Sequence, residues 1–138
     1  MATLGNPQET IAVLQKYGFN FQKKFGQNFL IDTHVLDKII AAAEIGPDDF
    51  VLEIGPGIGT MTQYLAEAAR EVTAVEIDKN LIPILADTLS AYSNVTVINY
   101  DILKVDISII HHVNQKADNL KILESIISYA RHQGIKVL

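Results

Sequence analysis

The stretch VLEIGPGIGT, at residues 51–60, decides the fold of this chain. Its first part has the character of a short buried strand, and Gly55, Gly57 and Gly59 follow at alternate positions. Glycine loses more backbone entropy on folding than other residues do, so three together require an explanation. A strand that turns through glycines into a helix brings backbone N–H groups and the positive helix end near a ligand. On its own, the stretch predicts either a ligand-binding turn or a tight corner.

Alternating strand and helix patterns surround this turn. Short apolar runs predict strands at 50–55, 71–77 and 94–101. Helical spacing predicts helices at 8–17, at 34–45 with a cap at Asp32 or Thr33, at 60–69, and from Asp78 to about Tyr92 with Pro83 in the first turn. Crossovers between parallel strands are right-handed, so this order predicts a Rossmann-like α/β fold, a parallel sheet with helices on both faces.

The last third of the chain differs in character. Residues 102–110 suit a strand or a loop, 118–134 show the pattern of a capped amphipathic helix, and IKVL at 135–138 suits one more strand. At 138 residues the chain is predicted to fold as a single domain, 1–138, with about four strands. If the final strand pairs with the first, the strand order is 3-2-1-4.

Composition narrows the class of protein. Hydrophobic residues make up 49% of the chain and charged residues 20%, as in globular proteins. The absence of cysteine excludes disulfides and thiolate metal sites. No apolar run approaches the roughly 20 residues that span a bilayer, and the first residues, MATLGNPQET, lack the regions of a signal peptide. We expect a soluble cytoplasmic protein.

Charge is unevenly distributed along the sequence. The net charge is −5, yet residues 10–31 contain three lysines and no acid, whereas residues 44–106 contain eleven acids and three bases. The acidic middle disfavours contact with phosphate backbones and suits a small cationic ligand. Solvation of the surface is the alternative explanation for most of these charges.

Polar side chains follow the predicted strands at the edge where the glycines lie. Glu76 ends the second strand, 21 positions after Gly55, and Asp101 ends the third. The carboxyl ends of parallel strands meet at one edge, and open α/β sheets bind ligands there. A carboxylate in the position of Glu76 can accept hydrogen bonds from both hydroxyls of a ribose. Helix capping is the alternative role for Asp78 or Asp101.

The spacing of the glycines separates two classes of nucleoside ligand. A pyrophosphate-binding fingerprint reads G-x-G-x-x-G, whereas this chain has G-x-G-x-G followed by Thr60. The turn contains no basic residue, which also disfavours a pyrophosphate and tolerates a sulfonium cation. S-adenosylmethionine is therefore favoured over NAD as the ligand.

Four stretches of the sequence resemble the rRNA adenine N6,N6-dimethyltransferases, which are related to the macrolide-resistance methylases. They are FGQNFLID at 25–32, VLEIGPGIGTMTQYLAEAA at 51–69, VTAVEID at 72–78 and YDILKVD at 100–106. The resemblance covers about residues 8–106. It implies a Rossmann-like methyltransferase fold, S-adenosylmethionine as cofactor, methyl transfer to adenine N6, and small-subunit rRNA as the partner.

The resemblance also implies roles for individual residues. Cofactor-binding positions of the family match Gln27, Asn28 and Leu30 around the methionine end, Gly55 and Gly57 in the glycine turn, Glu76 with Ile77 at the ribose, and Asp101 with Ile102 at the adenine. Lys23 and Lys24 are candidates for contact with rRNA phosphates, and plain surface exposure is the alternative. No residue is assigned to catalysis, and none to a metal.

One family motif has no counterpart in these residues. The family positions the adenine amino group and stacks the extruded base with an Asn-Leu-Pro-Tyr stretch, and base extrusion is general among enzymes that modify bases. The prolines here are Pro7, Pro47, Pro56 and Pro83, and none precedes an aromatic residue. We therefore expect this chain alone to bind cofactor without transferring methyl groups.

The end of the chain has a different resemblance. LKVDISII at 103–110 and LKILESIISYARHQGIKVL at 120–138 are similar to part of an EAL-type cyclic-di-GMP phosphodiesterase, although that family's metal-binding acids are missing. This indicates a chimera, natural or constructed, of a methyltransferase part at 1–106 and a tail of different origin at 107–138. His111 and His112 are expected to face solvent rather than bind a metal.

Two other functions stay open at this stage. One is a non-enzymatic folding or assembly module that keeps the glycine turn without a ligand. The other is a nicotinamide-dependent oxidoreductase, which the glycine spacing disfavours. A sheet that ends at IKVL leaves apolar strand edges, so we also expect self-association through the exposed sheet edge.

Overall fold

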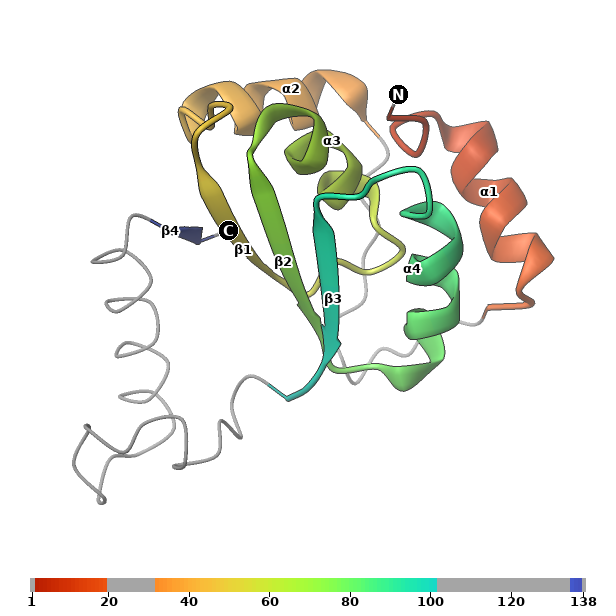
Figure 1. Cartoon of the computed structure of the whole chain (residues 1–138). Coiled ribbons are helices and arrows are strands. Elements are labelled where there is room, and N and C mark those ends of the chain that lie inside the picture. The colour runs from red at the N-terminus through yellow and green to blue at the C-terminus, as the bar shows by residue number, and fades with distance from the viewer. Residues whose placement is uncertain (1, 20–31, 102–134, 138) are drawn as a thin grey trace, which may run out of the picture.

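The computed structural model describes residues 2–19, 32–101 and 135–137 of the chain. In these residues four parallel strands form one sheet with the order β3-β2-β1-β4 (Figure 1). The strands are β1 (Phe50–Ile54), β2 (Glu71–Glu76), β3 (Val95–Asn99) and β4 (Ile135–Val137). The predicted parallel α/β sheet and its order 3-2-1-4 are confirmed.

The helices in the described residues are α1 (Pro7–Lys16), α2 (Thr33–Ala42), α3 (Thr60–Ala68), the 3-10 helix η2 (Lys79–Leu81) and α4 (Ile82–Thr88). The connections β1-α3-β2 and β2-α4-β3 step across the sheet in the same direction, so right-handed crossovers place α3 and α4 on one face. In Figure 1, α2 lies beside α3 and α1 lies beside α4. The helix predicted at 118–134 lies outside the described residues.

The N-terminus of α2 has the predicted cap. The Asp32 carboxylate accepts a hydrogen bond from the backbone N–H of His34, at 2.9 Å, and α2 begins at the next residue after Asp32. A side chain that satisfies one of the free N–H groups of a first turn stabilises a helix by about 1 kcal/mol. Asp32, rather than Thr33, is therefore the cap.

The helix predicted from Asp78 to about Tyr92 is confirmed in its Asp78 cap and in Pro83 near the first turn, and it is wrong in its end. Asp78 caps η2, α4 follows directly from Ile82 with Pro83 in its first turn, and α4 ends at Thr88. Proline has no N–H to continue a preceding helix, so the chain starts a new helix around it.

Two hydrophobic clusters hold the helices on the sheet. The cluster between α4 and α1 has the buried members Leu4, Ile58, Leu81, Ile84, Leu85 and Leu89. The cluster under α3 has the buried members Val51, Leu65, Ala66, Ala69 and Val72. Ile58 comes from the glycine turn and has no exposed surface, so burial of this side chain anchors the turn against α4.

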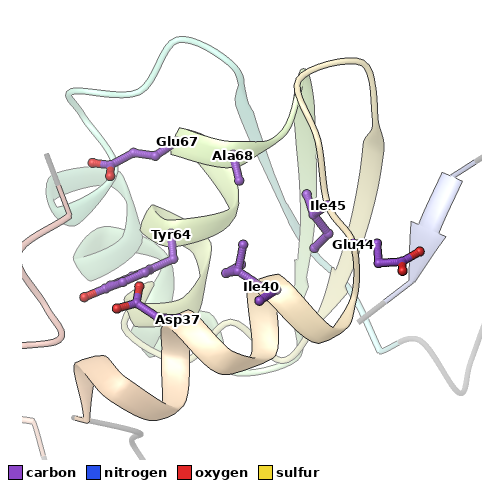
Figure 2. Close-up of a pocket in the computed structure, with 8 residues that line it drawn as sticks. Asp37, Ile40, Glu44, Ile45, Tyr64, Glu67 and Ala68 are labelled. Atoms are coloured by element: carbon purple, nitrogen blue, oxygen red, sulfur yellow. The ribbon is translucent and has the colours of Figure 1, made fainter.

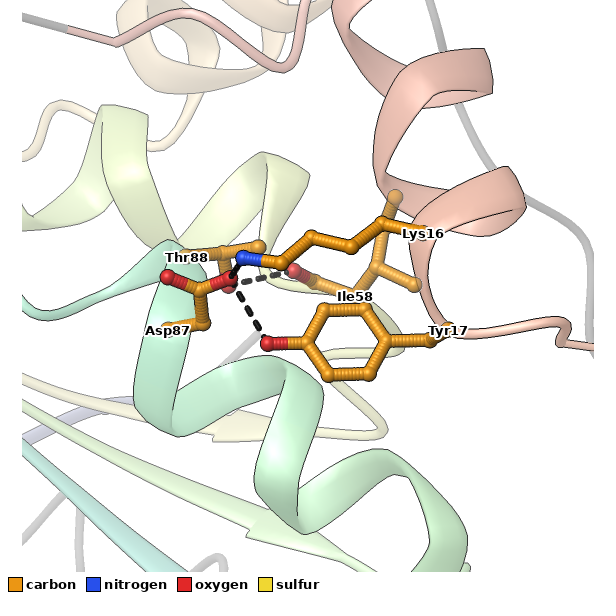
Figure 3. Close-up of polar contacts among 5 residues, drawn as sticks. All are labelled: Lys16, Tyr17, Ile58, Asp87 and Thr88. Carbon is orange, nitrogen blue, oxygen red and sulfur yellow. Dashed lines mark hydrogen bonds and ion pairs between the residues drawn. The ribbon is translucent and has the colours of Figure 1, made fainter.

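A carboxylate on α4 attaches α1 to the rest of the domain. Figure 3 shows Asp87 accepting hydrogen bonds from the Lys16 ammonium, at 2.6 Å, and from the Tyr17 hydroxyl, at 2.7 Å. These hydrogen bonds lower the pKa of Asp87 and raise the pKa values of Lys16 and Tyr17. The charged side chains of Lys16 and Asp87 are 61% and 41% exposed, so salt will weaken their attraction.

Lys136 on β4 contacts the segment between α2 and β1. The Lys136 ammonium lies 2.9 Å from the Asp49 carboxylate, and it donates hydrogen bonds to the backbone carbonyls of Ala43, at 3.2 Å, and Glu44. The hydrogen bond from Lys136 lowers the pKa of Asp49. A cation is favourable at the C-terminal end of a helix, so this lysine joins the last strand, the end of α2 and the start of β1.

Candidate functional site

The glycine turn continues directly from β1 into α3. The backbone N–H of Gly55 donates to the Val75 carbonyl at 2.9 Å and so extends the pairing with β2 by one residue. Gly55, Gly57 and Gly59 have φ angles of +75°, +63° and +96°, a region that residues with a side chain rarely adopt. The three glycines are therefore required by the path of the backbone.

Two of these glycines face different surroundings. A Cβ atom at Gly59 would lie 3.0 Å from Thr88 Oγ1 and 3.2 Å from Leu89, so α4 packs directly against this backbone. A Cβ atom at Gly55 would have nothing within 4 Å. The glycine turn is thus packed against α4 at Gly59 and is open at Gly55. The open space at Gly55 leaves room for a ligand to approach the backbone.

The carboxylate of Glu76 points at the glycine turn. Its two oxygens accept hydrogen bonds from the backbone N–H groups of Gly57, at 3.1 Å, and Asp78, at 2.9 Å. Only 3% of Glu76 is exposed, and burial raises its pKa, while the backbone donors oppose that shift. The predicted proximity of the glycines and this acid is confirmed.

The third strand supplies a polar residue that sequence reasoning missed. Asn99, and not Asp101, is the register partner of Glu76, and its side-chain amide donates to the backbone carbonyls of Glu76, at 2.7 Å, and Ile77, at 3.3 Å. Asp101 comes two residues after the end of β3 and is half-buried. The sequence pattern that could have identified Asn99 is a polar residue at the end of an apolar strand.

Glu53 is a second buried acid near the turn that the sequence prediction did not include. It is 5% exposed, and its carboxylate accepts a hydrogen bond of 2.6 Å from the Thr62 hydroxyl in the first turn of α3. Burial raises the pKa of Glu53 to about 7; the bond from Thr62 lowers it, and the charge of Glu76 raises it further. The sequence pattern that could have identified Glu53 is an acidic residue inside an otherwise apolar strand.

Polar side chains outside the turn hold it in place. The Thr88 hydroxyl of α4 donates to the Ile58 carbonyl at 2.8 Å, as Figure 3 shows. The amide of Gln63 donates to the Thr88 carbonyl at 2.9 Å, and its oxygen accepts from the backbone of Thr3 and Leu4. One buried glutamine thus joins α3, α4 and the start of the chain behind the turn.

Several predicted site residues are not among those that the structure describes. Outside the described residues lie Lys23, Lys24, Gln27, Asn28, Leu30, Ile102, His111 and His112. Ile77 is described, and its side chain is 42% exposed directly beside the buried Glu76. In the described parts of the chain, no group of three or more His, Asp or Glu side chains is arranged to hold a metal ion.

A separate pocket lies between α2 and α3, away from the glycine turn. It has a volume of about 440 Å³ and is lined by Asp37, Ile40, Ala41, Glu44, Ile45, Tyr64, Glu67 and Ala68. Asp37 and Tyr64 lie side by side at one end of it (Figure 2). Burial, together with the charges of Asp37 and Glu67, raises the pKa of Tyr64.

None of the helices in the described parts of the chain combines the length and apolar character needed to cross a membrane.

The sequence matches a known family over most of its length. A model of the ribosomal RNA adenine dimethylase family matches residues 18–133. The ribosomal RNA small subunit methyltransferase A of Lachnoclostridium phytofermentans is 67% identical over 130 residues, which are 94% of this chain and 45% of that protein. The protein of the same name from Alkaliphilus metalliredigens is 57% identical over 107 residues, 78% of this chain and 37% of that protein. The chain spans less than half the length of these relatives.

Solved structures agree with this match. The 23S rRNA methyltransferase ErmE is 44% identical, with a TM-score of 0.53, over 57% of this chain and 32% of that one. A dimethyladenosine transferase from Plasmodium falciparum is 35% identical, with a TM-score of 0.50, over 63% of this chain and 30% of that one. The predicted fold of S-adenosylmethionine-dependent methyltransferases, and S-adenosylmethionine as the cofactor of that class, are confirmed. The chain belongs to the ribosomal RNA adenine dimethylase family.

Proposed function

We propose that this chain is the cofactor-binding part of an rRNA adenine N6,N6-dimethyltransferase and binds S-adenosylmethionine at the glycine turn. The observation that carries the proposal is the hydrogen bond between the backbone N–H of Gly57 and the carboxylate of Glu76, at 3.1 Å. It places an acceptor for the ribose hydroxyls against a turn whose backbone is exposed at Gly55. This is the pairing that a nucleoside needs at the carboxyl edge of a parallel sheet.

The chemistry of the surrounding groups fits a cationic nucleoside. The oxygens of the Glu76 carboxylate accept backbone N–H groups of Gly57 and Asp78, and a carboxylate has about four acceptor sites, so the group can also accept ribose hydroxyls. The open space at Gly55 allows close approach to the backbone, and the exposed Ile77 offers an apolar surface beside the ribose site. The neighbouring Glu53 and Glu76 are acids, which favour a positive sulfonium over a phosphate.

The remaining cofactor contacts are proposed from the family resemblance. We assign Gln27, Asn28 and Leu30 to the methionine end and Asp101 with Ile102 to the adenine. We also propose that Lys23 and Lys24 contact rRNA phosphates in the family's reaction.

A titration of the full chain tests cofactor binding. Calorimetry with S-adenosylmethionine is expected to show one site, and calorimetry with NAD is expected to show none. Glu76→Ala removes the ribose acceptor, and its binding constant should fall roughly a hundredfold. Glu71→Ala, at the exposed start of the same strand, is the matched control and should bind like the parent chain.

The other outcomes of this titration decide between the competing functions. Binding of neither compound by a chain with the expected circular dichroism would reject the proposal in favour of a folding or assembly module. Binding of NAD alone would favour an oxidoreductase.

We further propose that these 138 residues bind cofactor without completing methyl transfer, because they contain no Asn-Leu-Pro-Tyr stretch to hold the adenine. Incubation of the chain with small-subunit RNA and methyl-labelled cofactor should leave the RNA unlabelled. Label in the N6-dimethyladenine fraction would contradict this part of the proposal and leave the cofactor site unaffected.

The different origin of the tail stays a prediction. The family match reaches residue 133, and one relative matches 130 residues of the chain, so both extend into the segment from 107 onward. This extension favours a common origin for most of the chain over a chimera. The source gene decides the matter, since an uninterrupted natural gene excludes a constructed junction.

A cytoplasmic location also stays a proposal, and its support is the family's rRNA substrate. Fractionation of the source cells tests it: the chain should be recovered with the cytoplasmic proteins.

A further inference from the structure

Glu53 is a buried acid for which the proposed cofactor contacts provide no role. It lies on β1 two residues before Gly55, and the first turn of α3 covers it. Its carboxylate accepts a hydrogen bond of 2.6 Å from Thr62 Oγ1. A buried carboxylate that accepts only one hydrogen bond pays a large desolvation cost when it is charged.

Among the residues that the structure describes, one charged group acts on Glu53. On β2, the negative charge of Glu76 raises the pKa of Glu53, because the two acids lie on neighbouring strands. On α3, Thr62 does not titrate. On β4, Lys136 lies opposite Val51 and is engaged by Asp49. Among the described residues, no lysine or arginine offsets the charge of Glu53.

The strand register places Glu53 and Glu76 on the same face of the sheet, because Glu53 is the partner of Ala74, which lies two residues before Glu76. Glu76 both interacts with Glu53 and binds the backbone of Gly57 in the turn. A positive charge placed at the turn would act on Glu53 in the opposite sense to the negative charge of Glu76. It would therefore stabilise the ionised carboxylate.

We propose that Glu53 is a positioning residue whose carboxyl gives up its proton when the cationic cofactor binds, so that cofactor binding is coupled to proton release. The proposal rests on the proposed function, because it needs a cation at the glycine turn. In this scheme the protonated form of the site binds weakly, and the ionised form, held by the Thr62 hydroxyl, binds tightly. The proton passes to solvent, and no bond of the cofactor changes.

The direction of the pH dependence follows from the free carboxyl, whose pKa is about 7. Below pH 7 most of the unliganded chain is protonated at Glu53, and the apparent affinity is reduced by that fraction. Affinity should therefore rise with pH and be roughly tenfold higher at pH 8 than at pH 6. Above pH 8 it should no longer change through this group.

The experiment compares the parent chain with Glu53→Gln, which keeps the size of the side chain and cannot ionise. S-adenosylmethionine is titrated at pH 6, 7 and 8 in two buffers of different ionisation enthalpy, which reports the protons released on binding. The amino group of S-adenosylmethionine titrates near this pH range whichever protein is used. The contribution of Glu53 is therefore the difference in proton release between the parent chain and Glu53→Gln. We expect the parent chain at pH 6 to release close to one proton more than Glu53→Gln.

Thr62→Val provides a second, independent variant. It removes the donor that stabilises the ionised carboxylate, so the rise in affinity should move to higher pH, whereas Thr62→Ser should keep the parent profile. Parallel profiles and equal proton release in all these proteins would overturn the inference. Failure of the parent chain to bind at any pH would instead reject the proposed function, so the two failures are distinguishable.

Discussion

At the scale of single residues, polar groups at the strand ends determine the shape of the glycine turn. Glu76 accepts hydrogen bonds from Gly57 and Asp78, and the Asn99 amide fixes the carbonyls of Glu76 and Ile77. Hydrogen bonds to a charged acceptor contribute about 1.5–3 kcal/mol each. The turn is therefore shaped before any ligand arrives, which lowers the entropy cost of binding.

Gly59 provides a direct test of this shape. Gly59→Ala places a Cβ atom 3.0 Å from Thr88 Oγ1 at a φ of +96°, so the free energy of unfolding should fall by about 2 kcal/mol or more. Gly46→Ala is the matched control, because its Cβ would lie 3.7 Å from the nearest side-chain atom, Asp49 Oδ2, without a positive φ. Urea unfolding of both variants checks the prediction, and equal stabilities would contradict it.

The ionisation of Glu53 should also appear in stability. Its pKa is about 7 in the folded chain, raised from 4.5, so the folded state binds this proton more tightly than the unfolded state. Stability is therefore lost through this group as pH rises from 4.5 to 7, by roughly 3 kcal/mol in total. Glu53→Gln lacks this loss, so its stability relative to the parent should increase by that amount between pH 4.5 and pH 8.

Urea unfolding of the parent chain and Glu53→Gln across this pH range measures the difference. A difference in unfolding free energy that does not change with pH would show that folding does not raise the pKa of Glu53.

At the scale of elements, α4 connects the outer helix to the ligand edge. Asp87 and Thr88 are neighbours, yet Asp87 binds α1 while the Thr88 hydroxyl binds the Ile58 carbonyl in the turn. Figure 3 shows both sets of contacts at the end of the same helix. The Thr88 hydroxyl therefore adds a polar link between α4 and the turn to the packing of α4 against Ile58 and Gly59.

Thr88→Val tests this connection without a change in side-chain size. Loss of the hydroxyl leaves the buried Ile58 carbonyl without this donor, and the affinity for S-adenosylmethionine should fall roughly tenfold. Thr88→Ser keeps the hydroxyl and should bind like the parent chain. Titration calorimetry compares the three proteins, and equal affinities would show that the turn keeps its shape without α4.

The attachment of β4 depends on Lys136. Lys136→Met removes the ion pair with Asp49 and the hydrogen bonds to the end of α2, so the edge of β1 that pairs with β4 should open more often. Hydrogen exchange of the β1 amides should accelerate, while exchange in β3 stays unchanged. Lys38→Met, on the surface of α2, is the control. Unchanged exchange in β1 would contradict the anchoring role.

At the scale of the whole molecule, the described sheet ends in two edge strands, β3 and β4, and β3 is the edge with exposed apolar side chains near its end. β3 is an edge strand in the described sheet, and Ile98 and Tyr100 at its end are 44% and 37% exposed. Unpaired edge strands with exposed apolar side chains pair with other chains. We therefore propose that the chain self-associates through this edge.

Light scattering across a range of concentrations tests this association. The parent chain should gain mass as concentration rises, and Ile98→Lys, which places a charge on the edge, should stay monomeric. Val35→Lys changes an exposed apolar residue on α2, 38% exposed against 44% for Ile98, and should associate like the parent. A parent chain that stays monomeric at millimolar concentration would contradict the proposal.

The sequence by itself determined the parallel sheet, its strand order and the meeting of Glu76 with the glycine turn. These features follow from local patterns, because alternating strands and helices with right-handed crossovers allow few arrangements. Only the tertiary structure decided the contact of Asn99 with the end of β2 and the burial of Glu53 under Thr62. These depend on which side chains meet across 9 to 23 residues of sequence, and no local pattern specifies that packing.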